Sequence, residues 1–260
     1  MNKNTDIHSQ INKTPLMIAG PCAVESEEQI FSLAAELSEM GVKFLRGGVF
    51  KPRTSPKSFQ GLGVEGLKYL RAAADKYNMY VVSELMSTTD IESCYDMIDV
   101  IQIGSRNMTS YGLLKEIGRK TAVDQKPVLL KRGFTATLNE LLLAADYISD
   151  AGNPNVILCL RGIRTFEQID SEFRFTPDLS AIPELKEIQG DRNHKILFDP
   201  SHACGDSKYV SKIACAALTL GADGLLVEVH KHPEKALSDG KQSLLPEALK
   251  EIINFTCHNK

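Results

Sequence analysis

The sequence predicts an α/β protein with a (β/α)8 fold, a TIM barrel, on three observations. Short apolar runs recur along the 260 residues, nearly every run ends close to a charged group or a potential metal ligand, and segments with helical periodicity separate the runs. Buried parallel strands read as continuous Leu-rich or β-branched runs, and a closed barrel gathers the groups that follow its strands on one face. The runs are Leu16–Ala19, Phe44–Arg46, Tyr80–Ser83, Val100–Ile103, Val128–Leu130, Val156–Leu160, Ile196–Phe198 and Leu225–Val227.

The segments between the runs predict the crossover helices of such a barrel. Alternating strands and helices with short loops require right-handed crossovers, and in a chain of this length they favour a closed barrel over an open sheet. Ser26 suits a helix start, and Gly41, Gly152 and Gly221 stand where helices should stop, each just before an apolar run. The clearest helical segments are Ser26–Met40, Val64–Tyr77, Leu138–Asp150 and Lys208–Leu220.

Composition and charge fit one catalytic domain over residues 15–260, with residues 1–14 as a short N-terminal arm. With 43% hydrophobic residues the chain has ample material for a core, and a net charge of −3 is not that of a nucleic-acid binder. No apolar stretch approaches the length of a membrane span, and residues 1–13 are polar, without a secretory signal. The six cysteines show no paired spacing, so we expect a reduced, cytoplasmic protein.

Four residues near the strand ends form a candidate metal site. Cys22 follows the first run, His202 the seventh, Glu228 ends the eighth, and Asp239 lies in the loop beyond it. One thiolate, one imidazole and two carboxylates suit a divalent transition ion, and these ligand types do not choose among Mn, Fe, Co, Zn and Cu. For Cys22 alone, a small buried apolar role is the commoner interpretation. The position of all four on one barrel face favours the metal site.

A second group near the strand ends is cationic and indicates an anionic substrate. Arginine grips phosphate or carboxylate as a bidentate fork and lysine adds a compact charge, so this concentration implies several anionic groups, more than one phosphate among them. The 51–56 segment, Lys-Pro-Arg-Thr-Ser-Pro, is either a phosphate clamp held by its prolines or a basic surface turn. The cations are Arg46, Lys51, Arg53, Arg106, Lys131, Arg132, Arg161 and Arg164.

Several motifs, in order, closely resemble one family over about residues 16–245, the 3-deoxy-D-arabino-heptulosonate 7-phosphate synthases of type I-beta. This resemblance implies a metal-dependent, aldol-like condensation of phosphoenolpyruvate with erythrose 4-phosphate, the entry step of the shikimate pathway and of aromatic amino acid biosynthesis. The motifs are the 19–22, 51–56, 58–63, 102–108, 130–133, 161–165, 199–202 and 228–240 segments.

The resemblance also implies roles for individual residues. Cys22, His202, Glu228 and Asp239 would hold a divalent ion, Mn2+, Fe2+, Co2+ or Zn2+. The phosphate of phosphoenolpyruvate would meet Arg106, Lys131 and Arg161, and its carboxylate and reacting centre would lie near Arg46 and Lys51. The phosphate of erythrose 4-phosphate would meet Arg53 and Thr54, and Glu84 would orient the attacking water.

Several positions depart from the pattern of this family, among them the 109–111 segment, Thr-Ser-Tyr, which replaces a Gln-Asn-Phe type of run. Leu160 stands where a Glu usually precedes Arg-Gly, Lys57 replaces a usual Tyr, and Cys204 adds a thiol two residues beyond His202. We expect Cys204 to pack under its loop, because four other ligands suffice for a metal site.

Two alternatives remain at this stage. The related 3-deoxy-D-manno-octulosonate 8-phosphate synthases condense phosphoenolpyruvate with arabinose 5-phosphate. That family carries a Lys-Ala-Asn-Arg-Ser-Ser type of segment where this chain has Lys51–Pro56, and the difference favours the shorter sugar. The other alternative is an inactive barrel that binds or regulates a partner, and such a protein would have no need of the metal ligands and cations.

The resemblance further implies a homotetramer or homodimer, although no segment identifies the interface. About fifteen residues precede the first strand, too few for a regulatory domain. We therefore expect no feedback inhibition by aromatic amino acids, unless a separate partner such as a chorismate mutase supplies it.

Overall fold

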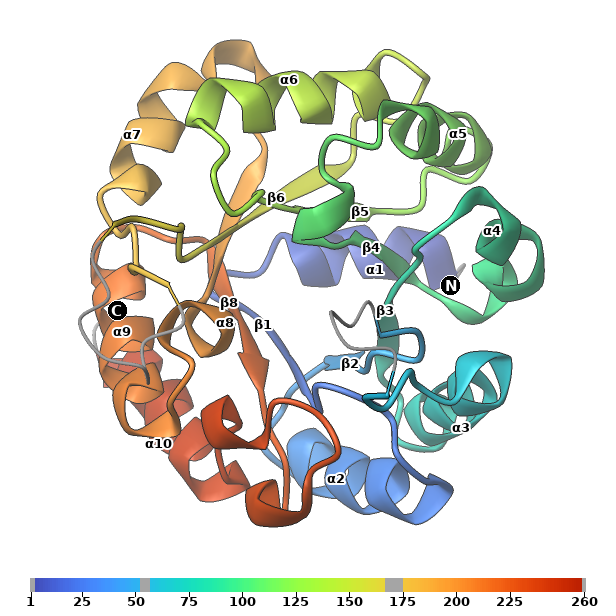
Figure 1. Cartoon of the computed structure of the whole chain (residues 1–260), viewed down its shortest axis with the longest axis vertical. Helices are drawn as coiled ribbons and strands as arrows, with labels where there is room; N and C mark the ends of the chain where they lie inside the picture. Colours follow the sequence, from blue (N-terminus) through green and yellow to red (C-terminus); the bar gives the residue numbers. More distant parts are fainter. Residues whose placement is uncertain (1–2, 52–56, 167–174, 259–260) are drawn as a thin grey trace.

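Eight parallel strands close into a barrel in chain order, which confirms the predicted fold (Figure 1). The computed structural model describes residues 3–51, 57–166 and 175–258. Every predicted run forms a strand. Most strands are a residue or two longer than the run, and in most of these the polar residue that follows the run is still part of the strand. The strands are β1 (Leu16–Gly20), β2 (Phe44–Arg46), β3 (Tyr80–Glu84), β4 (Val100–Ile103), β5 (Val128–Lys131), β6 (Val156–Arg161), β7 (Lys195–Asp199) and β8 (Gly224–Glu228).

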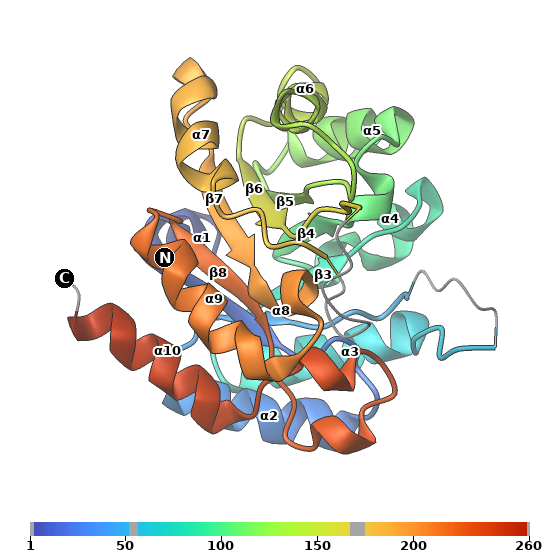
Figure 2. The same ribbon diagram turned by 60° about the vertical axis from the view of Figure 1, so that its left-hand side comes forward.

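Helices surround the barrel, and α10 lies beside α2 and α9 (Figures 1 and 2). The predicted start at Ser26 is confirmed, since its hydroxyl accepts from the Gln29 N–H. The helices are α1 (Lys3–Ile11), α2 (Glu27–Glu39), α3 (Gly63–Lys76), α4 (Thr88–Cys94), α5 (Tyr111–Thr121), α6 (Leu138–Ser149), α7 (Ala181–Ile188), α8 (Pro200–Cys204), α9 (Ser207–Thr219) and α10 (Pro246–His258). Short 3-10 turns are η1 (Tyr95–Met97), η2 (Ser105–Asn107), η3 (Gly190–Arg192), η4 (Pro233–Lys235) and η5 (Gly240–Gln242).

Two apolar clusters hold the barrel together, one inside it and one between strands and helices. Successive strand residues point to opposite faces, so each strand contributes to both clusters. In β6, Ile157 and Cys159 belong to the interior cluster, while Leu158 and Leu160 pack toward the helices. The next inward-facing position of β6 is Arg161, at the carboxyl end of the strand. The same alternation therefore fills the barrel and directs polar groups into its mouth.

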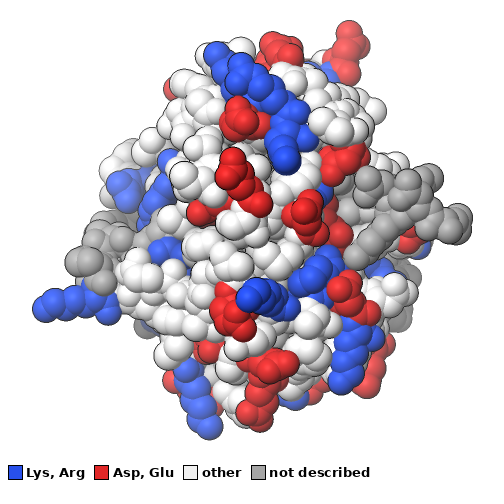
Figure 3. Space-filling model, turned by 90° about the vertical axis from the view of Figure 1, so that its right-hand side faces the viewer, with Lys and Arg blue, Asp and Glu red and all other residues white. Residues whose placement is uncertain are grey.

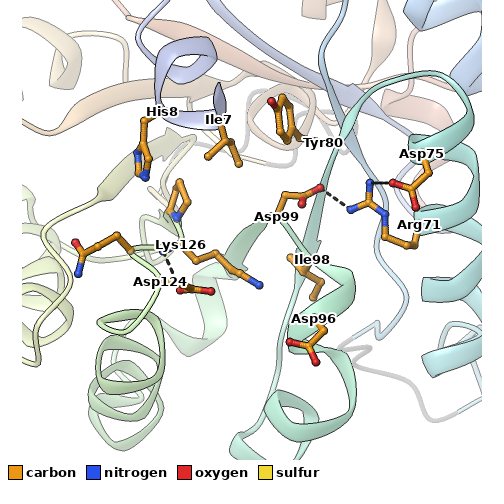
Figure 4. Close-up of a pocket in the computed structure, with 12 residues that line it drawn as sticks. Ile7, His8, Arg71, Asp75, Tyr80, Asp96, Ile98, Asp99, Asp124 and Lys126 are labelled. Atoms are coloured by element: carbon orange, nitrogen blue, oxygen red, sulfur yellow. Dashed lines mark hydrogen bonds and ion pairs between the residues drawn. The ribbon is translucent and has the colours of Figure 1, made fainter. Parts of the chain in front are cut away.

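Helix α1 closes the opposite, amino-terminal end of the barrel. Its Ile7 and Ile11 belong to the interior cluster, and the Tyr80 hydroxyl donates to the Asp6 carboxylate at 2.5 Å. Beside α1 lies a polar pocket of about 370 Å³ whose lining includes Lys126 and Asp99 (Figure 4). The segment expected to be an N-terminal arm thus carries a helix that packs on the barrel.

The outer surface in Figure 3 carries basic and acidic side chains close together, without a broad area of one sign. Within the described residues, no helix combines the length and the apolar character that crossing a bilayer requires.

Candidate active site

Four potential metal ligands converge at the carboxyl ends of the strands. One ligand atom from each of Cys22, His202, Glu228 and Asp239 lies within 4.8 Å of the others. The first three residues are buried and Asp239 is partly buried. They come from the loop after β1, helix α8 after β7, the last residue of β8 and the loop before η5. The sulfur, nitrogen and oxygen donors fit a divalent transition ion.

The Cys22 side chain is surrounded by polar groups. Its Sγ lies 3.2 Å from both Ser238 Oγ and Asp239 Oδ2, and it accepts from Lys51 Nζ at 2.9 Å. Burial, followed by the charge of Glu228, raises the pKa of Cys22 to about 12. Without a metal ion the side chain is therefore a thiol, and a bound metal would favour the thiolate.

Asp199 orients His202 toward the same centre. Its Oδ1 accepts from the His202 backbone N–H at 2.9 Å, and its Oδ2 lies 2.7 Å from His202 Nδ1. Burial lowers the pKa of His202 to about 4, so the imidazole is neutral at neutral pH. Burial opposes ionisation of Asp199, but His202 and Lys131 outweigh it and hold the pKa of Asp199 well below its usual range. With Nδ1–H donated to this carboxylate, Nε2 presents its lone pair to the metal position.

Glu228 is fully buried, and both of its oxygens are paired. Oε1 accepts from the Arg46 guanidinium at 2.8 Å, and Oε2 accepts from Gln242 Nε2 at 2.6 Å. Burial raises the pKa of Glu228, but His202 and Arg46 outweigh burial and lower it overall. The carboxylate therefore stays charged inside the barrel mouth. Arg46 also donates to the Pro21 carbonyl, which fixes the loop that carries Cys22.

Three of the cations predicted to bind phosphate lie at or just after the carboxyl ends of the neighbouring strands β4, β5 and β6. Lys131 and Arg161 end β5 and β6 and are buried, while Arg106 lies in η2 after β4 and is exposed. Arg161 donates to the His202 carbonyl at 3.1 Å, and Lys131 contacts Asp199. Lys131 and Arg161 thus adjoin Asp199 and His202, so an anion bound by these two cations would lie beside the metal position.

Glu84 lies at the end of β3 and accepts from Gln102 Nε2 at 3.1 Å. The position of the Glu84 carboxylate depends on a glycine in the loop that follows β4. A Cβ at Gly104 would lie 2.0 Å from Glu84 Oε1, so any larger residue would displace this carboxylate.

The remaining sequence predictions have different outcomes. Arg53 and Thr54 lie outside the described residues. Arg132 donates to Asp178 and to the Ala136 carbonyl, so it ties two loops together. Leu160 and Cys204 both pack in the outer apolar cluster. The Leu160 side chain, which departs from the family pattern, therefore faces the helices. Cys204 is outside the group of four ligands.

Sequence reasoning missed several supporting residues. Asp199 was noted only as part of a motif, and the roles of Gln242 and of the Ser201 hydroxyl, which accepts from the Glu228 N–H, were not foreseen. Also missed was the stacked pair Phe134 and Phe175, which contacts the arginines. For Asp199 a signal existed, because Asp before Pro predicts a helix cap.

Comparison with known proteins agrees with this geometry. The family model described as "DAHP synthetase I family" matches residues 2–259. A phospho-2-dehydro-3-deoxyheptonate aldolase of Thermotoga maritima is 52% identical over 237 residues, which cover 91% of this chain and 67% of the relative. A 2-dehydro-3-deoxyphosphooctonate aldolase of Geobacter sulfurreducens is 29% identical over 259 residues, covering 91% of this chain and 90% of that protein.

Solved structures give the same result. A crystal structure of phospho-2-dehydro-3-deoxyheptonate aldolase from Thermotoga maritima is similar with a TM-score of 0.87 and 50% identity, covering 95% of this chain and 70% of that chain. A truncated form of the 3-deoxy-D-arabino-heptulosonate 7-phosphate synthase of Thermotoga maritima has a TM-score of 0.84 and 46% identity, covering 95% and 87%. The chain is therefore an enzyme and belongs to the DAHP synthetase I family.

Proposed function

We propose that this enzyme condenses phosphoenolpyruvate with erythrose 4-phosphate to give 3-deoxy-D-arabino-heptulosonate 7-phosphate and inorganic phosphate, the first step of the shikimate pathway. The observation that carries the proposal is the contact between two groups of residues. The four potential metal ligands and the buried cations Lys131 and Arg161 share one barrel mouth, joined through His202 and Asp199. Membership of the family supports it.

The donor set fits a divalent metal as a resident cofactor. Cys22, His202, Glu228 and Asp239 would hold Mn2+, Fe2+, Co2+ or Zn2+. When bound, such an ion supplies Lewis acidity to the aldehyde oxygen of erythrose 4-phosphate.

Protein side chains position both substrates. Arg106, Lys131 and Arg161 bind the phosphate of phosphoenolpyruvate, because guanidinium forks and an ammonium group suit a dianion. Arg46 and Lys51 lie nearer its carboxylate and the reacting carbon, since Lys51 contacts Cys22 and Arg46 contacts Glu228. The proposal for Arg53 and Thr54, as the clamp for the phosphate of erythrose 4-phosphate, rests on the sequence alone.

The reaction forms one carbon–carbon bond and, at carbon 2, replaces the carbon–oxygen bond to phosphate with a carbon–oxygen bond to the oxygen of water. Carbon 3 of phosphoenolpyruvate attacks the aldehyde carbon, the aldehyde oxygen becomes a hydroxyl, and water adds at carbon 2. Phosphate then leaves with the oxygen that joined it to carbon 2. Glu84 is the candidate to orient this water, because its carboxylate lies at the end of β3 in a fixed contact with Gln102.

The test is loss of phosphoenolpyruvate absorbance after metal removal and addition of Mn2+, Fe2+, Co2+ or Zn2+ in turn, with erythrose 4-phosphate and arabinose 5-phosphate offered in parallel. Metal-dependent turnover of the four-carbon aldehyde alone is the expected result. Turnover of the five-carbon sugar would instead assign the octulosonate reaction. If neither sugar reacts with any of the four metals, the chain is an inactive barrel that serves a partner.

Assembly and location complete the proposal. We place the enzyme in the cytoplasm as a homotetramer or homodimer, with a separate chorismate mutase as the candidate regulatory partner. Gel filtration with light scattering, alone and with that mutase, tests the assembly.

A further inference from the structure

Two aromatic rings stack beside the arginines at the barrel mouth. Phe134 follows β5 and Phe175 follows β6, and the ring centroids lie 5.1 Å apart with 10° between the planes. Both residues are partly buried. Because β5 and β6 are paired neighbours, the stack joins the loops that follow adjacent strands.

Three guanidinium groups surround this aromatic pair. The Arg161 carbon Cζ lies 4.4 Å from the Phe175 centroid and 4.9 Å from the Phe134 centroid. The corresponding distances to Phe134 are 5.3 Å for Arg106 and 6.0 Å for Arg164. All lie within the range of an attractive cation–π contact.

The local backbone holds the rings in place. The Arg164 N–H donates to the Phe134 carbonyl at 2.7 Å, and Ile163 exchanges two backbone hydrogen bonds with Thr176, the residue that follows Phe175. A Cβ at Gly162 would lie 2.7 Å from Phe175 Cβ, so only glycine there lets the ring approach. The aromatic pair is therefore a built feature of the mouth.

Aromatic rings can orient arginine without neutralising it. A carboxylate would also align a guanidinium group, but it would compete with an incoming phosphate for the same N–H donors. Among the residues that the structure describes, no carboxylate forms an ion pair with Arg106. Its contact with Phe134 thus leaves the charge available while reducing the freedom of the side chain.

We propose that Phe134 and Phe175 are positioning residues that hold Arg106, Arg161 and Arg164 as a receptor for the phosphate of a substrate. The inference deepens the proposed function and rests on it for the identity of that substrate, phosphoenolpyruvate. The rings act through the arginines, which would meet the phosphate group rather than the reacting carbons. Their loss therefore weakens phosphate binding more than it slows bond making.

Steady-state kinetics and direct binding test the inference on the metal-loaded enzyme. Phe134→Leu should raise the KM for phosphoenolpyruvate about tenfold and change kcat less than twofold, as expected when a partly desolvated cation–π contact is lost. Phe134→Tyr, which keeps the aromatic face, should restore the wild-type KM. Phe175→Leu should act as Phe134→Leu does.

The chain offers a matched control on its outer surface. Tyr111 and Tyr147 stack with centroids 4.5 Å apart, and Lys115 lies over Tyr147, but this aromatic pair joins α5 to α6 on the outer surface, where Tyr111 is exposed. Tyr111→Leu should leave the KM unchanged. An unchanged KM in Phe134→Leu would contradict the positioning role. So would a fall in kcat as large, in fold-change, as the rise in KM, if Phe134→Tyr also fails to restore the wild-type KM.

Calorimetric titration with inorganic phosphate separates this inference from the proposed reaction. A wild-type enzyme that binds phosphate but condenses no sugar would contradict the proposed function, yet a weaker affinity in Phe134→Leu would still support the aromatic receptor. Equal phosphate affinities in the two proteins would contradict the receptor even if the reaction proceeds.

Discussion

Buried charges in the barrel mouth are stable because each has specific partners. Asp199 is fully buried, which would raise the free energy of its ionised form, but it contacts Lys131 Nζ, His202 Nδ1 and the His202 backbone N–H. An isolated buried charge is expensive, whereas a paired and hydrogen-bonded charge is tolerated. Removing one member therefore affects the others, which allows a direct test.

Asp199→Asn should weaken metal binding about 10- to 100-fold, the usual effect of losing the residue that orients a histidine ligand. The amide cannot hold Nδ1–H as a carboxylate does, and it leaves Lys131 without its anionic partner. Competition with a chromophoric chelator measures the affinity. Asp146→Asn, which removes a partly exposed ion pair with Arg192, is the control and should keep wild-type affinity. Equal affinities in all three proteins would mean that His202 needs no orienting carboxylate.

His194 makes stability depend on pH at a site remote from the ligands. Burial lowers the pKa of His194 below its usual 6.5, although Asp146 favours the charged form. Between the native and the unfolded pKa, the unfolded chain binds more protons, so stability falls as the pH drops below about 6.5. The wild type should therefore exceed His194→Gln in free energy of unfolding by more at pH 8 than at pH 5.5. Urea unfolding at both values measures it, and a difference independent of pH would contradict the expected titration.

At the residue scale, sequence reasoning found groups that follow strands and missed groups that support them. Cys22, His202 and Glu228 could be predicted because a barrel places every strand end in one mouth. Gln242 could not, since a polar residue at the end of the short turn η5 carries no signal that its amide reaches Glu228. The stacking of Phe134 was equally hidden, because its partner Phe175 lies beyond both α6 and β6 along the chain.

Among the elements, strands were easier to predict than the first helix. Each strand of the barrel is buried on both faces, so its sequence is a continuous apolar run with polar ends. Helix α1 offers only Ile7 and Ile11 as buried apolar residues in an otherwise polar segment. That pattern is too weak to distinguish a packed helix from an arm, and the interior that α1 covers exists only after the barrel has closed.

Ile7→Ala in α1 should lower the free energy of unfolding by about 2 kcal/mol, the lower end for a buried Ile, because a peripheral helix can relax into the space. The kcat should not change, since α1 lies at the amino-terminal end of the barrel and the metal ligands lie at the carboxyl end. Urea unfolding and steady-state kinetics measure the two quantities. Ser9→Ala, on the exposed side of the same helix, is the control. A fall in kcat that accompanies the fall in the free energy of unfolding would show that α1 is coupled to the active site.

Across the whole molecule, the four potential ligands connect the first strand of the barrel with the last two strands. Cys22 follows β1, while His202, Glu228 and Asp239 follow or end β7 and β8, and β1 pairs with β8 where the barrel closes. A metal bound there links segments more than 170 residues apart. Since the unfolded chain does not assemble these ligands, the binding free energy adds to the stability of the closed barrel.

Mn2+ at about 100 times its Kd should therefore stabilise the enzyme by about 2.7 kcal/mol, or about 5–10 °C in Tm for a chain of this size. Two buried thiols provide a matched pair for this test, because Cys22 contacts Asp239 whereas Cys204 packs in the outer apolar cluster. Cys22→Ser should lose most of the Mn2+-induced shift, and Cys204→Ser should keep it. Calorimetric scans with and without the ion measure both. A shift that survives Cys22→Ser but disappears in Cys204→Ser would move the thiolate ligand to α8 and overturn the proposed donor set.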